Sequence, residues 1–210
     1  MLARSVTTGR VMGVDLSRGM LEQAKKRCAR CNNVFLTCSD AVAFLSTFDV
    51  SSVHGIVCSF GLLYLDQRAF FDEAARVIRK GGFIAVLENR ADTLSEVMRV
   101  FKETLLAQPL SLGKAVRVRM PSDAKYVAQQ MQMRGFDIRS AQDDEFDVPA
   151  ASGKDVMAYL EKAAVGAGYF DAITPARREA FQRYFIDAWN SSPKPLNVRH
   201  SVCEVIGVKL

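Results

Sequence analysis

The chain has 210 residues, of which 49% are apolar and 24% charged, and its formal net charge is +5. This length is enough for one domain with a sizeable core, and no apolar run approaches the ~20 residues that a membrane span needs. The first ten residues lack the apolar core of a secretory signal, and the basic residues are spread along the chain, so we expect no nucleic-acid partner.

The first predicted element is a buried strand over residues 11–15, written VMGVD, which ends in Asp15. A helix is expected to begin after Ser17 and to run to about Cys31. In open α/β sheets, ligands bind at the carboxyl ends of strands, where an ionised carboxylate can accept two hydrogen bonds from a ribose diol. The alternative is that Asp15 only caps the helix that follows it.

The same pattern repeats in the next segments. A short strand is predicted over residues 34–37, followed by Asp40, which either faces a ligand or caps a helix that begins near Ala41. A third strand is predicted over residues 55–59, apolar on both faces as expected for a central parallel strand.

A helix capped by Asp66 follows the third strand. We expect Lys80 to lie in its last turn and Gly81 and Gly82 to end it. A fourth strand, residues 83–87, then closes on Glu88. The alternation of strands and helices predicts right-handed β-α-β units and a parallel sheet.

The second half of the chain is richer in helices. Ser122 is expected to cap a helix that ends at Gly135, and residues 142–146 are expected to form an exposed strand continuation or a loop. The other predicted elements are helices around residues 94–105, 156–164 and 174–189 and strands over residues 136–138 and 202–209.

The cysteine and histidine content argues against a metal site. Five cysteines in apolar contexts indicate reduced thiols in an intracellular protein. Cys28 and Cys31 form one C-x-x-C pair, but no second pair follows, and the only histidines are His54 and His200. We therefore expect no metal, and a structural role for His54 at the edge of its strand.

Four segments in order carry a family resemblance: VMGVDLSRGMLEQA, CSDA, IVCSFGLLYL and ARVIRKGGFIAVLE. This set resembles the class I S-adenosylmethionine-dependent methyltransferases, in particular the type 11 and ubiquinone/menaquinone C-methyltransferases. The resemblance implies a Rossmann-like α/β sheet with helices on both faces. It also implies a single domain over residues 1–210, with a core of residues 1–140 and 198–210 and a lid-like helical insertion at about 150–190.

The resemblance also implies a site for S-adenosyl-L-methionine. Asp15 matches the acid that binds the ribose hydroxyls, Asp40 matches the acid that accepts from the adenine amino group, and Ala41 would offer its N–H to the ring. The full set of implied cofactor-binding residues is Asp15, Leu16, Met20, Asp40, Ala41, Ser59 and Phe60.

Two residues are candidates for catalysis. A base is needed only if the acceptor must lose a proton, and Tyr64 and Glu88 are the candidates. Phe60 and Tyr64 fall where the methyl group meets the acceptor in the family, and the alternative is that both are core aromatics. The aromatic faces of the two late helices, which include Phe181 and Tyr184, suit a lid over a flat or apolar acceptor.

The chain departs from the family at its start. The family opens with a strand and a glycine-rich turn, whereas residues 2–8 here match only the tail of the helix that follows that turn. The expected position of this strand is between the strands that end at Asp15 and Ser59. Either those two strands close up, or buried sheet edges stay unpaired at a cost of several kcal/mol.

The expected function is methyl transfer from S-adenosyl-L-methionine to a small-molecule acceptor, in the cytoplasm, or in mitochondria if the acceptor is a quinone. The absent glycine-rich turn supports an alternative, a non-catalytic remnant that serves as a binding or assembly partner. A second alternative is an NAD-dependent Rossmann oxidoreductase, although its G-x-G-x-x-G fingerprint is also absent.

Overall fold

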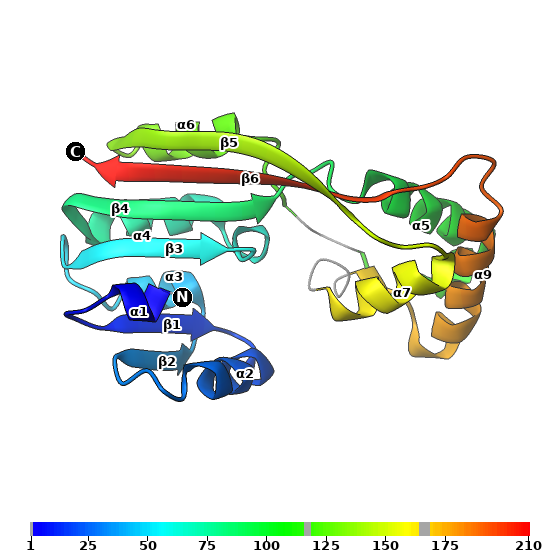
Figure 1. Ribbon diagram of the computed structural model, residues 1–210, viewed down its shortest axis with the longest axis horizontal. Coiled ribbons are helices and arrows are strands. Elements are labelled where there is room, and N and C mark those ends of the chain that lie inside the picture. The colour runs from blue at the N-terminus through cyan, green and yellow to red at the C-terminus, as the bar shows by residue number, and fades with distance from the viewer. Residues whose placement is uncertain (1, 116–118, 164–168) are drawn as a thin grey trace.

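The computed structural model describes residues 2–115, 119–163 and 169–210 (Figure 1). Its strands are β1 (Val11–Asp15), β2 (Val34–Cys38), β3 (Val53–Ser59), β4 (Ile78–Asn89), β5 (Phe136–Val148) and β6 (Val198–Lys209). Its α-helices are α1 (Leu2–Ser5), α2 (Arg18–Cys28), α3 (Ala41–Leu45), α4 (Gln67–Val77), α5 (Ser95–Ala107), α6 (Ala124–Gln132), α7 (Gly153–Lys162) and α9 (Arg178–Asn190). Short 3₁₀ turns lie at η1 (Leu62–Tyr64), η2 (Pro109–Ser111) and η3 (Pro175–Arg177).

The strands form two separate ladders. β1 pairs in parallel with β2, and the other ladder has the order β3-β4-β6-β5, in which β3 and β4 are parallel and β6 is antiparallel to both of its neighbours. Figure 1 draws β1 next to β3 with both arrows in the same direction, but no ladder joins them. Of the two alternatives, the described residues show the second: β1 and β3 do not pair with each other, and their facing edges are unpaired.

The α/β part of the molecule has its own core. α4 and α6 cover one face of the four-stranded ladder, where Phe71, Ile84, Met131 and Val205 are fully buried. Ile56 and Cys58 of β3 also pack against this core. Side chains alternate between the two faces of a strand, so Val57, which lies between them, points to the other face. Val57 is 52% exposed, so helices cover the central strands less completely there.

A second core lies in a helical lobe. α5, α7 and α9 pack around Phe101, Phe181 and Phe185, and the extended strands β5 and β6 connect this lobe to the α/β part (Figure 1). The lobe also includes α5 (Ser95–Ala107), which lies before the helical insertion expected at about residues 150–190. Across the described residues, no helix is both long enough and apolar enough to cross a membrane.

Several predicted boundaries differ from the structure. α4 ends at Val77, a turn before Gly81, because Ile78 adopts extended backbone angles and pairs with Val53 of β3. Asp123 caps α6 in place of Ser122, since the Asp123 carboxylate accepts the N–H of Tyr126 at 2.7 Å. A 3₁₀ turn over residues 175–177 precedes α9, and Ala164 lies outside the described residues.

Candidate functional site

Asp15 lies at the carboxyl end of β1, as predicted. Its Oδ1 accepts the N–H of Ser17 at 2.7 Å, and Ser17, whose Oγ accepts the N–H of Met20 at 3.3 Å, is the residue that caps α2. Asp15 therefore shapes the turn into α2 without being its N-cap. Its second carboxylate oxygen has no recorded partner in the described part of the chain, so it can accept further hydrogen bonds.

Asp40 lies beside Asp15, at the end of β2. The N–H of Ser39 donates to the Asp15 carbonyl at 3.2 Å, which ties the two strand ends together. Asp40 is the N-cap of α3, because its Oδ1 accepts the N–H of Ala43 at 2.9 Å. The capping alternative is thus correct for one oxygen of Asp40, and the exposed side chain leaves the other oxygen accessible.

The remaining residues at this strand end present apolar surface and a backbone donor. The side chains of Leu16 and Met20 are both largely exposed, on the loop and first turn that follow Asp15. Ala41 is the first residue of α3, so its N–H lies outside the hydrogen-bond ladder of that helix. This group can therefore pack against a flat ring and donate to it.

Ser59 ends β3, on the other side of the unpaired gap, and Phe60 follows it. Phe60 has a φ of 53°, the left-handed region that costs a non-glycine residue ~1–2 kcal/mol. The Phe60 N–H donates to the Leu87 carbonyl at 2.8 Å, so pairing with β4 holds this strained conformation. Residues in such conformations cluster at functional sites. Nothing in the sequence pattern predicted the strain at Phe60.

Glu88 is buried with 0% of its surface exposed, and it positions the turn after β3. Its carboxylate accepts the N–H groups of Leu63 at 3.2 Å and of Asn89 at 2.8 Å. Burial raises the pKa of Glu88, whereas these N–H donors oppose the rise. In this arrangement Glu88 supports η1, the turn that carries Tyr64, and its side chain does not reach the molecular surface.

Tyr64 is 59% exposed, so it is not a core aromatic. Its partial burial raises the pKa of its hydroxyl, and the nearby Glu88 carboxylate adds to the rise. Burial, with a smaller contribution from Glu88, also raises the pKa of Cys58 to about 12, which keeps that thiol protonated near neutral pH. Of the two candidate bases, Tyr64 is exposed and Glu88 is not.

The aromatic face of α9 points into the helical lobe. Phe181 is 0% exposed, and its ring lies 4.9 Å from that of Phe101, centroid to centroid. The expectation that this face covers an acceptor is therefore wrong for Phe181, because packing within the lobe occupies its side chain. Tyr184, on the same helix, is 50% exposed.

A buried polar cluster lies between the helical lobe and the sheet, and nothing in the sequence predicted it. The Tyr159 hydroxyl of α7 lies 2.6 Å from Nε2 of His200, whose Nδ1 lies 3.2 Å from Oδ1 of Asn89. The ring of Phe146 stacks on that of His200 at 5.1 Å. Burial lowers the pKa of His200. These residues are far apart in the sequence, so no local spacing could signal that they meet.

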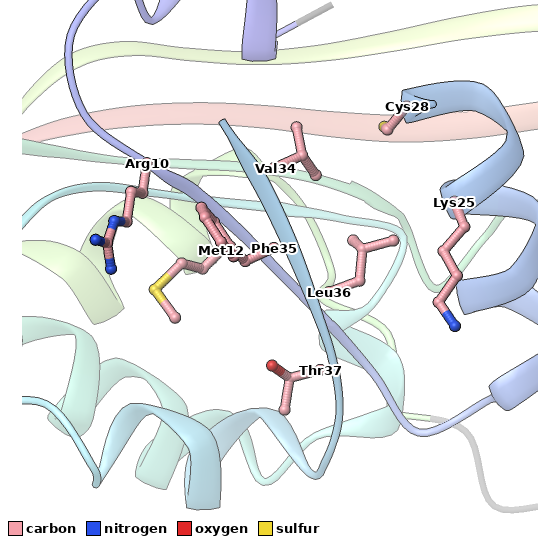
Figure 2. A pocket seen from close by; sticks show the side chains of 8 residues that line it. All are labelled: Arg10, Met12, Lys25, Cys28, Val34, Phe35, Leu36 and Thr37. Carbon is pink, nitrogen blue, oxygen red and sulfur yellow. The ribbon is translucent and has the colours of Figure 1, made fainter. Parts of the chain in front are cut away.

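An open pocket of the described residues lies elsewhere, on the β1–β2 ladder (Figure 2). It has a volume of about 580 Å³ and contains none of the predicted site residues. The guanidinium of Arg10 lies 5.4 Å from the centre of the Phe35 ring in its lining. The lining residues are Arg10, Met12, Lys25, Cys28, Val34, Phe35, Leu36 and Thr37.

The structure thus divides the predicted site into two groups. Asp15, Leu16, Met20, Asp40 and Ala41 gather at the ends of β1 and β2. Ser59, Phe60, Tyr64 and Glu88 gather at the ends of β3 and β4. The carboxyl ends of β1 and β3 point to the same side of the α/β part (Figure 1), and the unpaired gap separates the two groups.

Part of this chain is similar in sequence to known proteins. Residues 1–82 match the family described as methyltransferase domain. The chain is similar to the demethylmenaquinone methyltransferase of Staphylococcus haemolyticus, with 33% identity over 95 residues, which are 45% of this chain and 39% of the relative. The match thus spans about two fifths of that relative's length.

Solved structures match nearly the whole chain. YcgJ from Bacillus subtilis has a TM-score of 0.60 at 20% identity, covering 99% of this chain and 86% of that one. A geranyl diphosphate C-methyltransferase from Streptomyces coelicolor, solved with Mg²⁺, geranyl diphosphate and S-adenosyl-L-homocysteine, has a TM-score of 0.52 at 15% identity, covering 100% and 66%. Residues 1–82 therefore carry a methyltransferase-domain sequence, and the chain has the fold of the class I S-adenosylmethionine-dependent methyltransferases.

Proposed function

We propose that this chain binds S-adenosyl-L-methionine at the carboxyl ends of β1, β2 and β3 and transfers its methyl group to a small-molecule acceptor. The observation that carries the proposal is Asp15, whose carboxylate is fixed by the Ser17 N–H at 2.7 Å while its other oxygen stays available. A carboxylate held in this way can accept from ribose hydroxyls without reorganising on binding.

The residues around Asp15 fit the rest of the cofactor. The free oxygen of Asp40 can accept from an adenine amino group, and the Ala41 N–H can donate to a ring nitrogen. Leu16 and Met20 offer exposed apolar side chains for the flat base to pack against. The structural relative from Streptomyces coelicolor was solved with S-adenosyl-L-homocysteine, which supports the same class of ligand here.

When bound, S-adenosyl-L-methionine supplies an electrophilic methyl group on a sulfonium, and a neutral thioether leaves. No acid is needed to expel that leaving group, so the contribution of the chain is to hold donor and acceptor in line and to exclude water. Phe60 and Tyr64 would meet the acceptor, and the Tyr64 hydroxyl can hydrogen-bond an acceptor proton. Glu88 would act on Tyr64 through η1, whose backbone it holds.

One observation favours a second candidate function. No ladder joins β1 to β3 in the described residues, so the two groups of site residues lie on separate ladders. A chain in which these groups do not form one cofactor site would serve as a binding or assembly partner.

Calorimetric titration distinguishes these functions. We expect S-adenosyl-L-homocysteine to bind the chain and NAD⁺ not to bind. Asp15→Ala should weaken binding of S-adenosyl-L-homocysteine by about 10- to 100-fold, because hydrogen bonds to a charged group contribute ~1.5–3 kcal/mol. Asp49→Ala is the matched control, since Asp49 is exposed and precedes the amino end of β3. A folded chain that binds neither ligand would instead be a non-catalytic partner, and binding of NAD⁺ alone would indicate an oxidoreductase.

A further inference from the structure

A layer of buried polar residues lies between the two apolar cores. Along β6, Val198 belongs to the core of the helical lobe and Cys203 to the core of the α/β part. Along β4 and the turn after it, Val86 belongs to the α/β core and Leu94 to the core of the lobe. The buried polar residues between these positions are Glu88, Asn89, Thr93, His200 and Ser201. The two cores therefore meet across hydrogen-bonding groups.

His200 is central to this layer, and its partners determine which ring nitrogen carries the proton. Nδ1 lies 3.2 Å from Oδ1 of Asn89, an amide oxygen that can only accept, so Nδ1 is the protonated nitrogen. Nε2 is then the acceptor, and it accepts the hydroxyl of Tyr159 at 2.6 Å. Tyr159 belongs to α7, whereas His200 and Asn89 belong to β6 and β4. The neutral imidazole therefore bonds the helical lobe to the four-stranded ladder.

The surroundings of the imidazole favour its neutral form. Its recorded polar partners among the described residues are uncharged: Asn89, Tyr159 and Thr93, whose Oγ1 lies 3.4 Å from Nδ1. The ring of Phe146 covers one face of the imidazole. A proton added to His200 would create a buried charge without a carboxylate partner in the described part of the chain, and burial accordingly lowers the pKa of His200.

The charged side chains that flank these partners in the sequence are engaged elsewhere. The Glu88 carboxylate accepts two backbone N–H groups. The others form ion pairs with one another, Arg90 with Asp92 and Glu145, and Arg199 with Asp147 and Glu145. These pairs leave the charge of His200 as the one that a change of pH near neutrality would alter in this layer.

The same layer reaches the turn that carries Tyr64. The Asn89 N–H donates to Oε1 of Glu88 at 2.8 Å, and Oε2 accepts the N–H of Leu63 in η1 at 3.2 Å. A continuous series of hydrogen bonds thus runs from α7 through His200, Asn89 and Glu88 to η1. Coupling along such a series requires a member with two states, and an imidazole changes its charge between roughly pH 5 and pH 8.

We propose that His200 is a pH-sensitive latch: its neutral form holds α7 against the sheet and, through Asn89 and Glu88, fixes η1, and its protonation releases both. Protonated Nε2 becomes a donor and can no longer accept the Tyr159 hydroxyl, so the bond to the lobe is lost. β1, β3 and β4 all point toward the side on which the lobe lies (Figure 1), so release would loosen the lobe beside the candidate site. The latch rests on the contacts of His200 and not on the proposed function.

Hydrogen exchange of the whole chain at pH 7.5 and pH 5.5 tests the latch, with each rate divided by the intrinsic rate at the same pH. We expect the protection of α7 and η1 to fall by about three- to tenfold at the lower pH, because the released imidazole titrates near 6.5 and the latched one below it. The released state binds the additional proton, so falling pH favours it. α4 and α6, in the separate α/β core, should keep their protection.

Replacement of each histidine assigns the effect. His200→Gln keeps a polar side chain that does not titrate, so we expect the pH dependence of α7 and η1 to disappear. His54→Gln is the matched control, since His54 is the other histidine of the chain and is exposed in β3. This variant should keep the pH dependence of the parent.

Tyr159→Phe tests the latch without changing His200. It removes only the hydroxyl, so we expect the protection of α7 and η1 to fall about tenfold already at pH 7.5, with little further fall at pH 5.5. If His200→Gln lacks the circular dichroism of the parent, the comparison of Tyr159→Phe with the parent decides the outcome.

Three results would overturn the proposal. The first is an equal fall of α7 protection with pH in the parent and in the folded variants that lack the latch. The second is a fall in α7 that leaves η1 unchanged, which would confine the role of His200 to the lobe. The third is an equal loss of protection in α4 and α6, which would indicate general destabilisation by acid.

Discussion

Phe181→Ala is expected to destabilise the chain by about 3–5 kcal/mol, the usual cost of truncating a fully buried phenylalanine. Phe181 is 0% exposed and contacts Phe101 of α5, so the cavity would open at the centre of the helical lobe. Urea denaturation monitored by circular dichroism measures the loss of unfolding free energy.

Hydrogen exchange then shows where the loss occurs. Because the lobe has a core separate from that of the α/β part, we expect faster exchange in α5, α7 and α9 and little change in α4 and α6. Tyr184→Ala is the matched control on the same helix, with an exposed side chain and an expected effect below about 0.5 kcal/mol. Equal destabilisation by the two variants would contradict the assignment of Phe181 to the core of the lobe.

Glu88→Ala is expected to destabilise the chain by about 2–4 kcal/mol, because it leaves two N–H groups, those of Leu63 and Asn89, without their acceptor. The variant should also loosen the turn that carries Tyr64. Faster hydrogen exchange at η1, measured together with urea denaturation, would reveal both effects. A loss of unfolding free energy without any change at η1 would contradict the positioning role.

Glu88→Gln tests the raised pKa of the same group. The folded chain holds the Glu88 proton to higher pH than the unfolded chain, whose carboxyl titrates near 4.5. The contribution of Glu88 to the unfolding free energy therefore falls as pH rises above 4.5 and levels off above the folded pKa. Glutamine does not ionise, so the stability of Glu88→Gln relative to the parent should increase from pH 4 to pH 8.

The control for this pH dependence is Glu204→Gln, in the exposed position of β6. It should show no comparable rise relative to the parent over the same pH range. A constant difference between Glu88→Gln and the parent across the range would contradict a raised pKa.

The order of elements in the α/β part could be predicted because local signals agree with tertiary pairing there. The apolar run ending in Asp15 is both a strand by pattern and the partner of β2. The resemblance also drew attention to the boundary between the strands that end at Asp15 and Ser59, where the two ladders are separate, although the sequence left open whether these strands would pair.

The remaining features depend on long-range contacts that local pattern does not encode. Lys80, Gly81 and Gly82 look like a helix end, but Ile78 pairs with Val53, and all three lie within β4. The Glu88 carboxylate accepts the N–H of Leu63, 25 residues earlier in the chain, and Nδ1 of His200 lies 3.2 Å from Oδ1 of Asn89, 111 residues earlier. Spacing predicted Phe181 on the apolar face of a helix but could not show which surface that face contacts.

The most direct test of the central claim is to map where S-adenosyl-L-homocysteine binds, by following the backbone amide signals of the chain during a titration. The account predicts shifts at Ser17, Ala41 and Phe60, which flank the carboxyl ends of β1, β2 and β3, with no shift around the pocket of Figure 2. Shifts confined to that pocket, or no shifts from a folded chain at saturating ligand, would contradict it.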